Sequence, residues 1–214
     1  MTHEHDHEHE HGHEHEHHHD HGDEEELDYA AQVEAFRADK DDAFRFSPGS
    51  PIPHEVRHDF PGLPYFPVDE SLRFEGLALA PYAGDQPTSF QIPTSDNQLK
   101  PAHRAGSFAF ELGGEPRRLT AYVIDGGHGD SVFVPFLDAT SGHETYGAGR
   151  YLDIEPEEDG TYALDFNLAY HPSCVSSPYY SCPITPAENR LPDRIEAGER
   201  LAEGEGGDGD GSHG

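Results

Sequence analysis

Seven short segments rich in β-branched and aromatic residues follow one another between positions 72 and 168, with turn residues rather than helices between them. Glycine-containing turns such as Gly113-Gly114 and Asp159-Gly160 separate several of these segments. Short strands at this spacing without intervening helices are typical of antiparallel sheets. The sequence therefore predicts a mainly β domain, an antiparallel barrel or sandwich, with strands at 72–82, 88–93, 106–112, 118–124, 131–138, 148–154 and 161–168.

One helix is predicted before the strands, at about residues 27–45. Its apolar residues, among them Val33, Phe36 and Phe44, fall mostly on one face, and good helix formers occupy most other positions. The run Ser47-Pro48-Gly49-Ser50-Pro51 ends the helix, because proline cannot continue its hydrogen-bond ladder.

The two ends of the chain differ in composition from the middle. Residues 1–26 alternate His with Asp or Glu, and residues 201–214 are rich in Gly and acidic residues. Such low-complexity sequence has too few apolar side chains to build a core. We therefore expect a β-rich domain at 27–200 between two disordered tails, at 1–26 and 201–214.

The chain is strongly acidic, with 43 Asp and Glu against 13 Lys and Arg and a formal net charge of −30. Only Lys40 and Lys100 are lysines, so the surface combines many carboxylates with few long apolar stems. This composition suits a protein that stays soluble in concentrated salt, and we infer a halophilic source. The same charge repels nucleic acids and anionic membranes, so neither is expected as a partner, and no protein partner is indicated.

The sequence lacks the usual signals for export or membrane insertion. No apolar run approaches the length of a membrane-spanning helix, and the first thirty residues lack the apolar core of a signal peptide. Two cysteines are too few for a disulfide scaffold in a chain of 214 residues. We therefore expect a cytoplasmic protein.

The N-terminal tail concentrates a metal-binding side chain. Imidazole is the commonest protein ligand for divalent transition metals, and Zn²⁺, Ni²⁺, Cu²⁺ and Co²⁺ all accept it. In an extended chain, residues at alternate positions project to the same side. Eleven histidines occur in the tail, at every second position as far as the seventeenth: His3, His5, His7, His9, His11, His13, His15, His17, His18, His19 and His21.

This pattern predicts a metal-handling protein that binds Zn²⁺ or Ni²⁺ through the tail. Many overlapping sets of three or four imidazoles can form, so we expect moderate affinity with little selectivity between metals. The alternative is a solvating arm whose metal affinity is incidental to its role.

Several separated motifs of the folded part occur in an order that resembles the bacterial and archaeal domain of unknown function 1684 family. They are Phe60-Pro61-Gly62-Leu63, Tyr180-Ser181-Cys182-Pro183, Glu188-Asn189-Arg190-Leu191-Pro192 and Ile195-Glu196-Ala197-Gly198-Glu199. The resemblance covers about residues 35–200 and implies an uncharacterised β-rich domain, without an activity, cofactor or catalytic residue. That family more usually has Asn-Pro-Pro-Cys where this chain has His171-Pro172-Ser173-Cys174. A ligand role for His171 would therefore be particular to this protein.

Three interpretations are open for Cys174 and Cys182, which are eight positions apart in a proline-rich stretch. A disulfide between them would stabilise the fold by about 2–3 kcal/mol, although a reducing cytoplasm disfavours it. Together with His171 they would supply three ligands to Zn²⁺. As buried structural thiols they would need no partner, and this is the interpretation that we favour.

A second group of polar residues is a candidate ligand-binding site: Tyr146, Arg150, Asn167 and Arg190. Converging at the mouth of a barrel, the arginines would bind an anionic ligand, and the protein would be a small-ligand-binding or enzymatic β-barrel. The simpler alternative is that the arginines pair with Asp or Glu at loop corners, in a module with no binding site. No nucleophile–base pair or catalytic motif is evident, so no catalytic residue is predicted.

Overall fold

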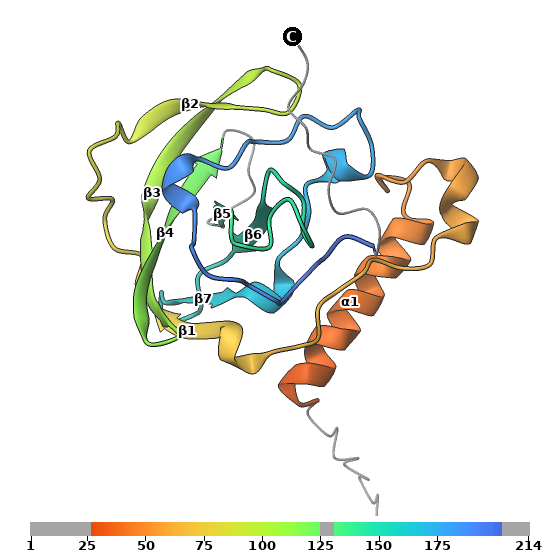
Figure 1. Cartoon of the computed structure of the whole chain (residues 1–214), viewed down its shortest axis with the longest axis horizontal. Coiled ribbons are helices and arrows are strands. Elements are labelled where there is room, and N and C mark those ends of the chain that lie inside the picture. The colour runs from red at the N-terminus through yellow and green to blue at the C-terminus, as the bar shows by residue number, and fades with distance from the viewer. Residues whose placement is uncertain (1–26, 125–130, 203–214) are drawn as a thin grey trace, which may run out of the picture.

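The computed structural model describes residues 27–124 and 131–202, and Figure 1 shows how its helix and strands are arranged. The predicted N-terminal tail (1–26) and most of the predicted C-terminal tail lie outside these residues. The described part contains one α-helix and two antiparallel sheets, as the sequence predicted for a mainly β domain. No helix within it is long and apolar enough to cross a membrane.

Helix α1 (Tyr29–Phe46) occupies the predicted position, with capping groups at both ends. The carboxylate of Asp28 accepts the amide of Ala31 over 2.8 Å, and the amide of Ser47 bonds to the carbonyl of Ala43 over 2.9 Å just before Pro48. The buried side of the helix carries Val33 and Arg37. Phe36 is 46% exposed, so the apolar face expected from the sequence is only partly covered.

All seven predicted strands are present, although their bounds differ. Five of them form one antiparallel sheet in the order β2-β3-β4-β5-β6, and the other two form the pair β1–β7. The 161–168 segment is a strand only in its first half, and its second half is a 3-10 turn, Phe166–Leu168. The strands are β1 (Arg73–Leu77), β2 (Ser89–Pro93), β3 (Leu99–Leu112), β4 (Glu115–Ile124), β5 (Val132–Phe136), β6 (Arg150–Ile154) and β7 (Tyr162–Asp165).

Strand β3 begins seven residues before the predicted 106–112 segment, because it pairs with β2 along its first half and with β4 along nearly all of its length. The register shifts between Arg104 and Gly106, where the two halves meet. A side chain at Gly106 would place its Cβ only 2.5 Å from the carbonyl oxygen of Ala80. Glycine is therefore required for this close approach of two backbones.

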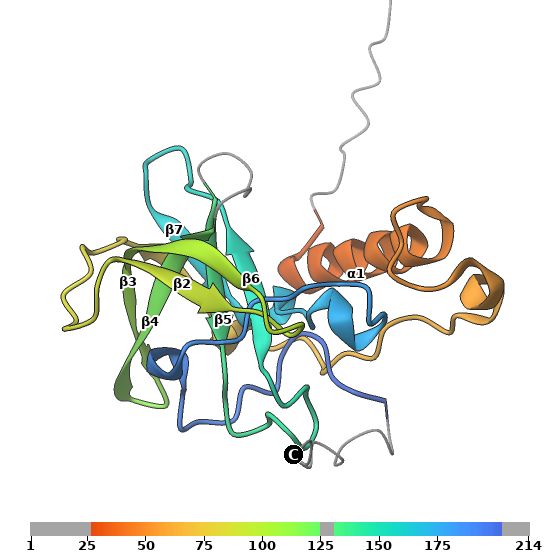
Figure 2. The same ribbon diagram turned by 90° about the horizontal axis from the view of Figure 1, so that it is seen from above.

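The five-stranded sheet does not close on itself, because its two ends are formed by β2 and β6. The barrel that the sequence left open as one alternative is therefore not formed. Figures 1 and 2 show α1 on the side of the molecule away from the β3–β4 ribbon. The core contains side chains from both sheets and from the C-terminal segment, including Phe108, Phe136, Leu164, Phe166 and Ile195, all fully buried.

The C-terminal segment, residues 183–200, is mostly irregular but is fixed by backbone pairing. Leu137 donates its amide to the carbonyl of Asn189 over 2.9 Å, and the amide of Leu191 bonds to the carbonyl of Leu137 over 2.8 Å. Further along, the amide of Glu199 bonds to the carbonyl of Ala169 over 2.8 Å. The segment thus crosses the core and joins β5 to the residues that follow β7.

Asn189 closes a gap within the sheet. Strands β4 and β5 have a single paired position in the ladder, Tyr122 with Phe133. The fully buried Asn189 side chain accepts the amide of Thr120 over 2.8 Å and donates to the carbonyls of Thr120 and Pro135, over 2.8 and 2.7 Å. Backbone groups that a regular ladder would pair are therefore satisfied by one side chain.

Candidate functional site

The two cysteines lie side by side as free thiols, on either side of a proline-rich loop. The amide of Cys174 donates to Sγ of Cys182 over 3.4 Å. Cys174 lies in a 3-10 turn, Ser173–Val175, that begins directly after Pro172, and it is half-buried. Cys182 is buried, with 8% of its surface exposed. The loop therefore returns on itself and brings together two residues eight positions apart.

Cys182 is held by the hairpin that connects β2 and β3. Its amide donates to Oγ of Ser95 over 3.1 Å, and its carbonyl accepts the amide of Ser95 over 2.8 Å. The next residue, Pro183, forms an antiparallel bridge with Thr94. Cys182 is thus fixed on the sheet, whereas Cys174 approaches it from the loop.

Tyr146 belongs to this cluster and not to the polar group to which the sequence assigned it. Its backbone amide donates to Nε2 of His171 over 3.2 Å, and its hydroxyl is influenced electrostatically by Cys174. Burial raises the pKa of the Tyr146 hydroxyl, and the neighbouring Cys174 raises it further. Four residues from two separate sequence predictions, namely Tyr146, His171, Cys174 and Cys182, therefore form one site.

The two thiols of this site differ in acidity. Hydrogen bonds from Cys182, Ser95 and Tyr146 lower the pKa of Cys174, and they outweigh the opposing effect of burial. The pKa of Cys182 is raised, first by its hydrogen bond to Cys174 and then by burial. A thiol that accepts several hydrogen bonds becomes a thiolate more readily, and the thiolate is the nucleophilic form.

The His171 side chain is largely buried, and its imidazole is neutral. Desolvation lowers its pKa to about 3, and the positive charges of Arg150 and Lys40 act in the same direction. Its Nε2 accepts the Tyr146 amide, and its Nδ1 lies 3.8 Å from Oε2 of Glu199. Neutral imidazole is the metal-binding form, but the acceptor nitrogen here is already occupied by a backbone amide.

The three predicted zinc ligands of the domain do not form a metal site in the part of the chain that the structure describes. No group of three or more His, Cys, Asp or Glu side chains within residues 27–124 and 131–202 is arranged to hold a metal ion. His171 lies beside the cysteines, yet its imidazole nitrogens face Tyr146 and Glu199.

Arg150 serves as a clamp on the C-terminal segment. It is fully buried, and its guanidinium donates to the carbonyl oxygens of Ile195 over 2.7 Å and Glu199 over 3.1 Å, and also to that of Ala197. The equally buried carboxylate of Asp138 lies 3.5 Å away. Burial lowers the pKa of Arg150, and Asp138 opposes that effect. This geometry assigns Arg150 a structural role.

The remaining predicted ligand-binding residues lie in different surroundings. Asn167 is buried, and its side chain joins α1 to the β1–β7 sheet through hydrogen bonds to Tyr29 (2.8 Å), Asp69 (2.8 Å) and Asp165 (3.1 Å). Arg190 has its side chain exposed, beside Leu137 at the bridge to the C-terminal segment. The structure therefore does not gather these two side chains with Arg150 at one opening, and ligand binding by the group stays a prediction.

Comparisons with known proteins show which family the chain belongs to. Residues 58–200 match the family described as "Protein of unknown function (DUF1684)". The chain belongs to this family. The solution NMR structure of an uncharacterized protein from Haloarcula marismortui is similar, with 38% identity and a TM-score of 0.59, over 81% of this chain and 95% of that one. No curated protein matches this chain significantly.

The DUF1684 match includes the whole cysteine site but leaves out the histidine tail and α1. Helix α1 is nevertheless tied to the family's domain. Lys40 pairs with Glu199 over 2.7 Å, and the second carboxylate oxygen of Glu199 accepts the amide of His171 over 2.7 Å. Glu199 therefore links the helix to the loop that carries the cysteines.

Two hollows border this part of the DUF1684 domain. One, of about 560 Å³, lies between α1 and the β6–β7 region and is lined mainly by apolar side chains, among them Phe36, Ile154 and Leu168. The other, of about 330 Å³, has the cysteine loop as one wall, at His171 and Val175. Neither hollow is lined by the arginines that the sequence proposed for ligand binding.

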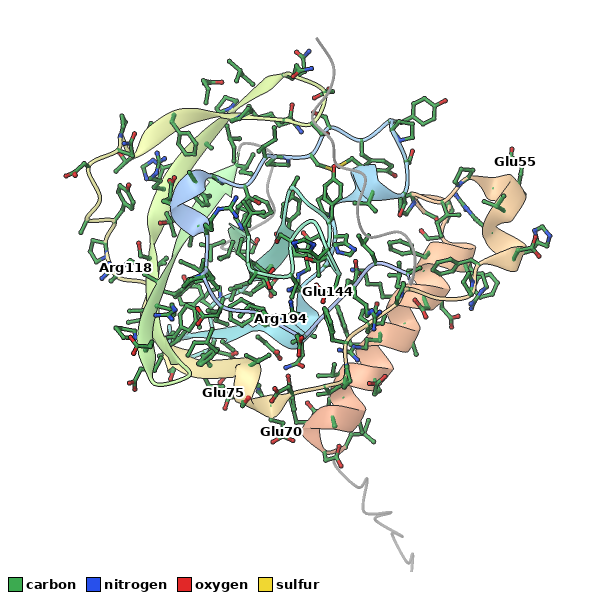
Figure 3. All side chains as sticks on the ribbon, viewed as in Figure 1. Glu55, Glu70, Glu75, Arg118, Glu144 and Arg194 are labelled. Atoms are coloured by element: carbon green, nitrogen blue, oxygen red, sulfur yellow. The ribbon has the colours of Figure 1, made fainter. Side chains whose placement is uncertain are left out.

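Charged residues that organise the domain, one of them buried within the sheet, were not predicted from the sequence. Arg104 is 5% exposed, donates to Glu188 over 2.7 and 2.9 Å, and lies 4.0 Å from the ring centroid of Phe90. Figure 3 shows a more exposed ion pair, Glu144 and Arg194, at the centre of the view, with 2.7 Å between Oε1 and Nη2. A charge at an inward-facing position of a strand is the signal that would have identified Arg104, which lies between the buried Ala102 and Gly106 of β3.

Proposed function

We propose that this protein binds divalent transition metal ions, Zn²⁺ or Ni²⁺, through its N-terminal histidine tail and carries that tail on a folded β domain. The observation that carries the proposal is the set of eleven histidines between His3 and His21. At neutral pH most of these imidazoles are unprotonated and available as ligands, because the ordinary pKa of histidine is about 6.5. The tail, residues 1–26, also carries eleven acidic residues, which add electrostatic attraction for cations.

The domain supports this role as a rigid point of attachment. The tail joins the domain two residues before α1, whose first residue is firmly held. The hydroxyl of Tyr29 donates to both carboxylate oxygens of Asp165, over 2.8 and 2.9 Å, and accepts from Asn167 over 2.8 Å. The tail is therefore attached next to a firmly held residue, and metal binding by the tail would require no change in the domain.

Salt adaptation and a cytoplasmic location are part of the same proposal. The acidic excess, with 43 acidic residues against 13 basic ones, and the presence of only two lysines support adaptation to concentrated salt. The free thiols support a reducing compartment.

A small-ligand or enzymatic function at Arg150, Asn167 and Arg190 has weaker support. The first two side chains are engaged with protein groups, and the third is exposed at a different place. The metal-binding tail is therefore the better-supported function.

Elemental analysis of the full chain, purified in high salt without affinity tag or chelator, tests the proposal. A matched variant replaces the eleven tail histidines with Gln and keeps the tail's length and acids. A control variant keeps the histidines and replaces the tail acids with Asn and Gln. We expect zinc or nickel above trace in the unmodified chain and in the control, and none in the histidine variant. Equal metal in the histidine variant would place the site elsewhere, and no metal in any of them would contradict the proposal.

A further inference from the structure

The cysteine pair has the geometry of a reactive site. The backbone amide of Cys174 donates to Sγ of Cys182 over 3.4 Å, so the two residues are in direct contact. Cys182 is anchored to the β2–β3 hairpin through Ser95, whereas Cys174 lies on a single 3-10 turn. A bond between the sulfurs therefore requires movement of the loop alone and not of the sheet.

Access to the two sulfurs is unequal. Cys174 is half-buried, and the residues that follow it, Val175 and Ser176, are exposed. Cys182 is buried beneath the loop. A small oxidant in solution reaches Cys174 first, and Cys182 is held behind it as the second thiol.

We propose that Cys174 and Cys182 form a reversible thiol–disulfide pair, in which Cys174 reacts first with hydrogen peroxide and Cys182 completes the disulfide. This is separate from the metal-binding tail. The chain has no other cysteine, so the pair can only react within itself or with a second molecule.

The chemistry proceeds in two steps. The Cys174 thiolate attacks one peroxide oxygen, the O–O bond breaks, and hydroxide leaves, which gives a sulfenic acid on Cys174. The sulfur of Cys182 then attacks the Cys174 sulfur, the S–S bond forms, the S–O bond breaks, and the departing hydroxide takes up a proton as water. In total two thiols lose two electrons and two protons, and one peroxide becomes two waters. A small dithiol such as dithiothreitol reverses the reaction.

The electrostatics of the site agree with this order of events. The pKa of Cys174 is lowered by hydrogen bonds from Cys182, Ser95 and Tyr146, so Cys174 is the thiol that ionises first. The raised pKa of Cys182 keeps its proton until the sulfenic acid has formed. Tyr146 is thus a positioning residue for the Cys174 thiolate.

Peroxide treatment of the full-length protein, with EDTA present so that metal on the tail cannot catalyse oxidation, tests the proposal. We expect both thiols to disappear together, a Cys174–Cys182 peptide lighter by two hydrogens in mass spectrometry, and recovery with dithiothreitol. In C182S, dimedone should label Cys174 as the sulfenic acid, while in C174S the remaining Cys182 should stay unlabelled. Persistent thiols in the folded, treated protein would overturn the proposal, as would dimedone on Cys182 at a rate equal to that on Cys174.

A second measurement uses the unmodified chain and so does not depend on the folding of the cysteine variants. Iodoacetamide should alkylate Cys174 faster than Cys182. Measured as a function of pH, the alkylation rate of Cys174 should rise as its thiolate forms. In Y146F, which loses a hydrogen bond to that thiolate, the midpoint of this pH profile should shift upward. Tyr179 is 94% exposed, and Y179F is the matched control that should leave the midpoint unchanged. Equal alkylation of the two cysteines, or an unchanged midpoint in Y146F, would contradict the assigned roles.

Discussion

The backbone amide of Tyr146 donates a hydrogen bond to Nε2 of His171, 3.2 Å away, and this contact requires the imidazole to be neutral. Protonation would place an N–H group against another N–H group in a site from which water is largely excluded. Arg150 and Lys40 add positive charge nearby, and Glu199, 3.8 Å from Nδ1, is already paired with Lys40. The pKa of His171 is therefore lowered to about 3.

The stability of the fold should depend on pH through His171. In the unfolded chain the histidine takes up a proton at about pH 6.5, whereas in the folded chain it resists protonation down to about pH 3. The unfolded state binds the extra proton within this window, so the free energy of unfolding falls as the pH is lowered, by up to about 1.4 kcal/mol per pH unit from this group. Urea denaturation at several pH values between about 3 and 6.5 measures how steeply the free energy of unfolding depends on pH.

His171→Gln isolates this contribution, because glutamine does not titrate and can still accept the Tyr146 amide. We expect a flatter pH profile in the variant than in the unmodified chain. His58 is exposed, and His58→Gln is the matched control that should leave the profile unchanged. Identical profiles for His171→Gln and the unmodified chain would show that His171 is not held neutral.

Asn189→Ala should destabilise the domain. The substitution leaves backbone groups of Thr120 and Pro135 buried without a partner, at a cost of about 1–3 kcal/mol each. The neighbouring Arg190 is exposed, and Arg190→Ala should change the free energy of unfolding by no more than about 0.5 kcal/mol. Chemical denaturation of both variants makes the comparison, and equal effects would contradict the role given to Asn189.

Arg150→Met distinguishes a structural arginine from a ligand-binding one. It leaves Asp138 as a buried charge and three carbonyls without their donor, so we expect a loss of about 3–5 kcal/mol. Combining it with Asp138→Asn removes the remaining charge and should recover part of that loss. If Arg150→Met instead leaves the denaturation midpoint unchanged, the guanidinium does not hold the fold, and the ligand-binding interpretation gains support.

The parts of the fold that depend on local pattern were predictable, and those that depend on distant partners were not. Segments rich in β-branched and aromatic residues between turns located all seven strands, and the helix ends at Phe46, directly before the proline-containing run that was expected to end it. The early start of β3 was missed because its first residues, with Pro101 and Arg104 among them, include no β-branched side chain and no Phe, Tyr or Trp. Only the pairing with β2 makes them a strand. A barrel would form only if the edge strands β2 and β6 paired with each other, and no local sequence pattern predicts whether they do.

In the candidate site, too, residue types were predictable from the sequence, whereas the contacts between distant residues were not. Cys174, Cys182 and His171 were singled out by residue type, but spacing alone could not distinguish a disulfide, a metal site and separate thiols. Tyr146 joined them through a contact between loops twenty-five residues apart in sequence. Arg150 was expected at an opening and is instead fully buried. Its partners are backbone carbonyls, which every residue has, so no sequence motif identifies them.

The stability of the protein should increase with salt. With a formal net charge of −30, the folded chain repels itself at low ionic strength. Raising potassium chloride from about 0.1 M to about 1 M shortens the Debye length from about 10 Å to about 3 Å and screens that repulsion. Thermal unfolding should therefore shift to higher temperature, and a glycerol solution without the added salt should not reproduce the whole shift. A melting temperature independent of salt would contradict the inferred salt adaptation.

Equilibrium dialysis against Zn²⁺ at pH 7 and pH 5, with the full chain beside the variant in which the eleven tail histidines are Gln, decides whether the tail is the metal-binding site. Protonation of imidazole competes with metal, so zinc should bind at pH 7 and be largely released at pH 5. We expect the histidine variant to bind no more zinc at pH 7 than the unmodified chain does at pH 5. Undiminished binding by the histidine variant, with a domain that remains folded by circular dichroism, would contradict it.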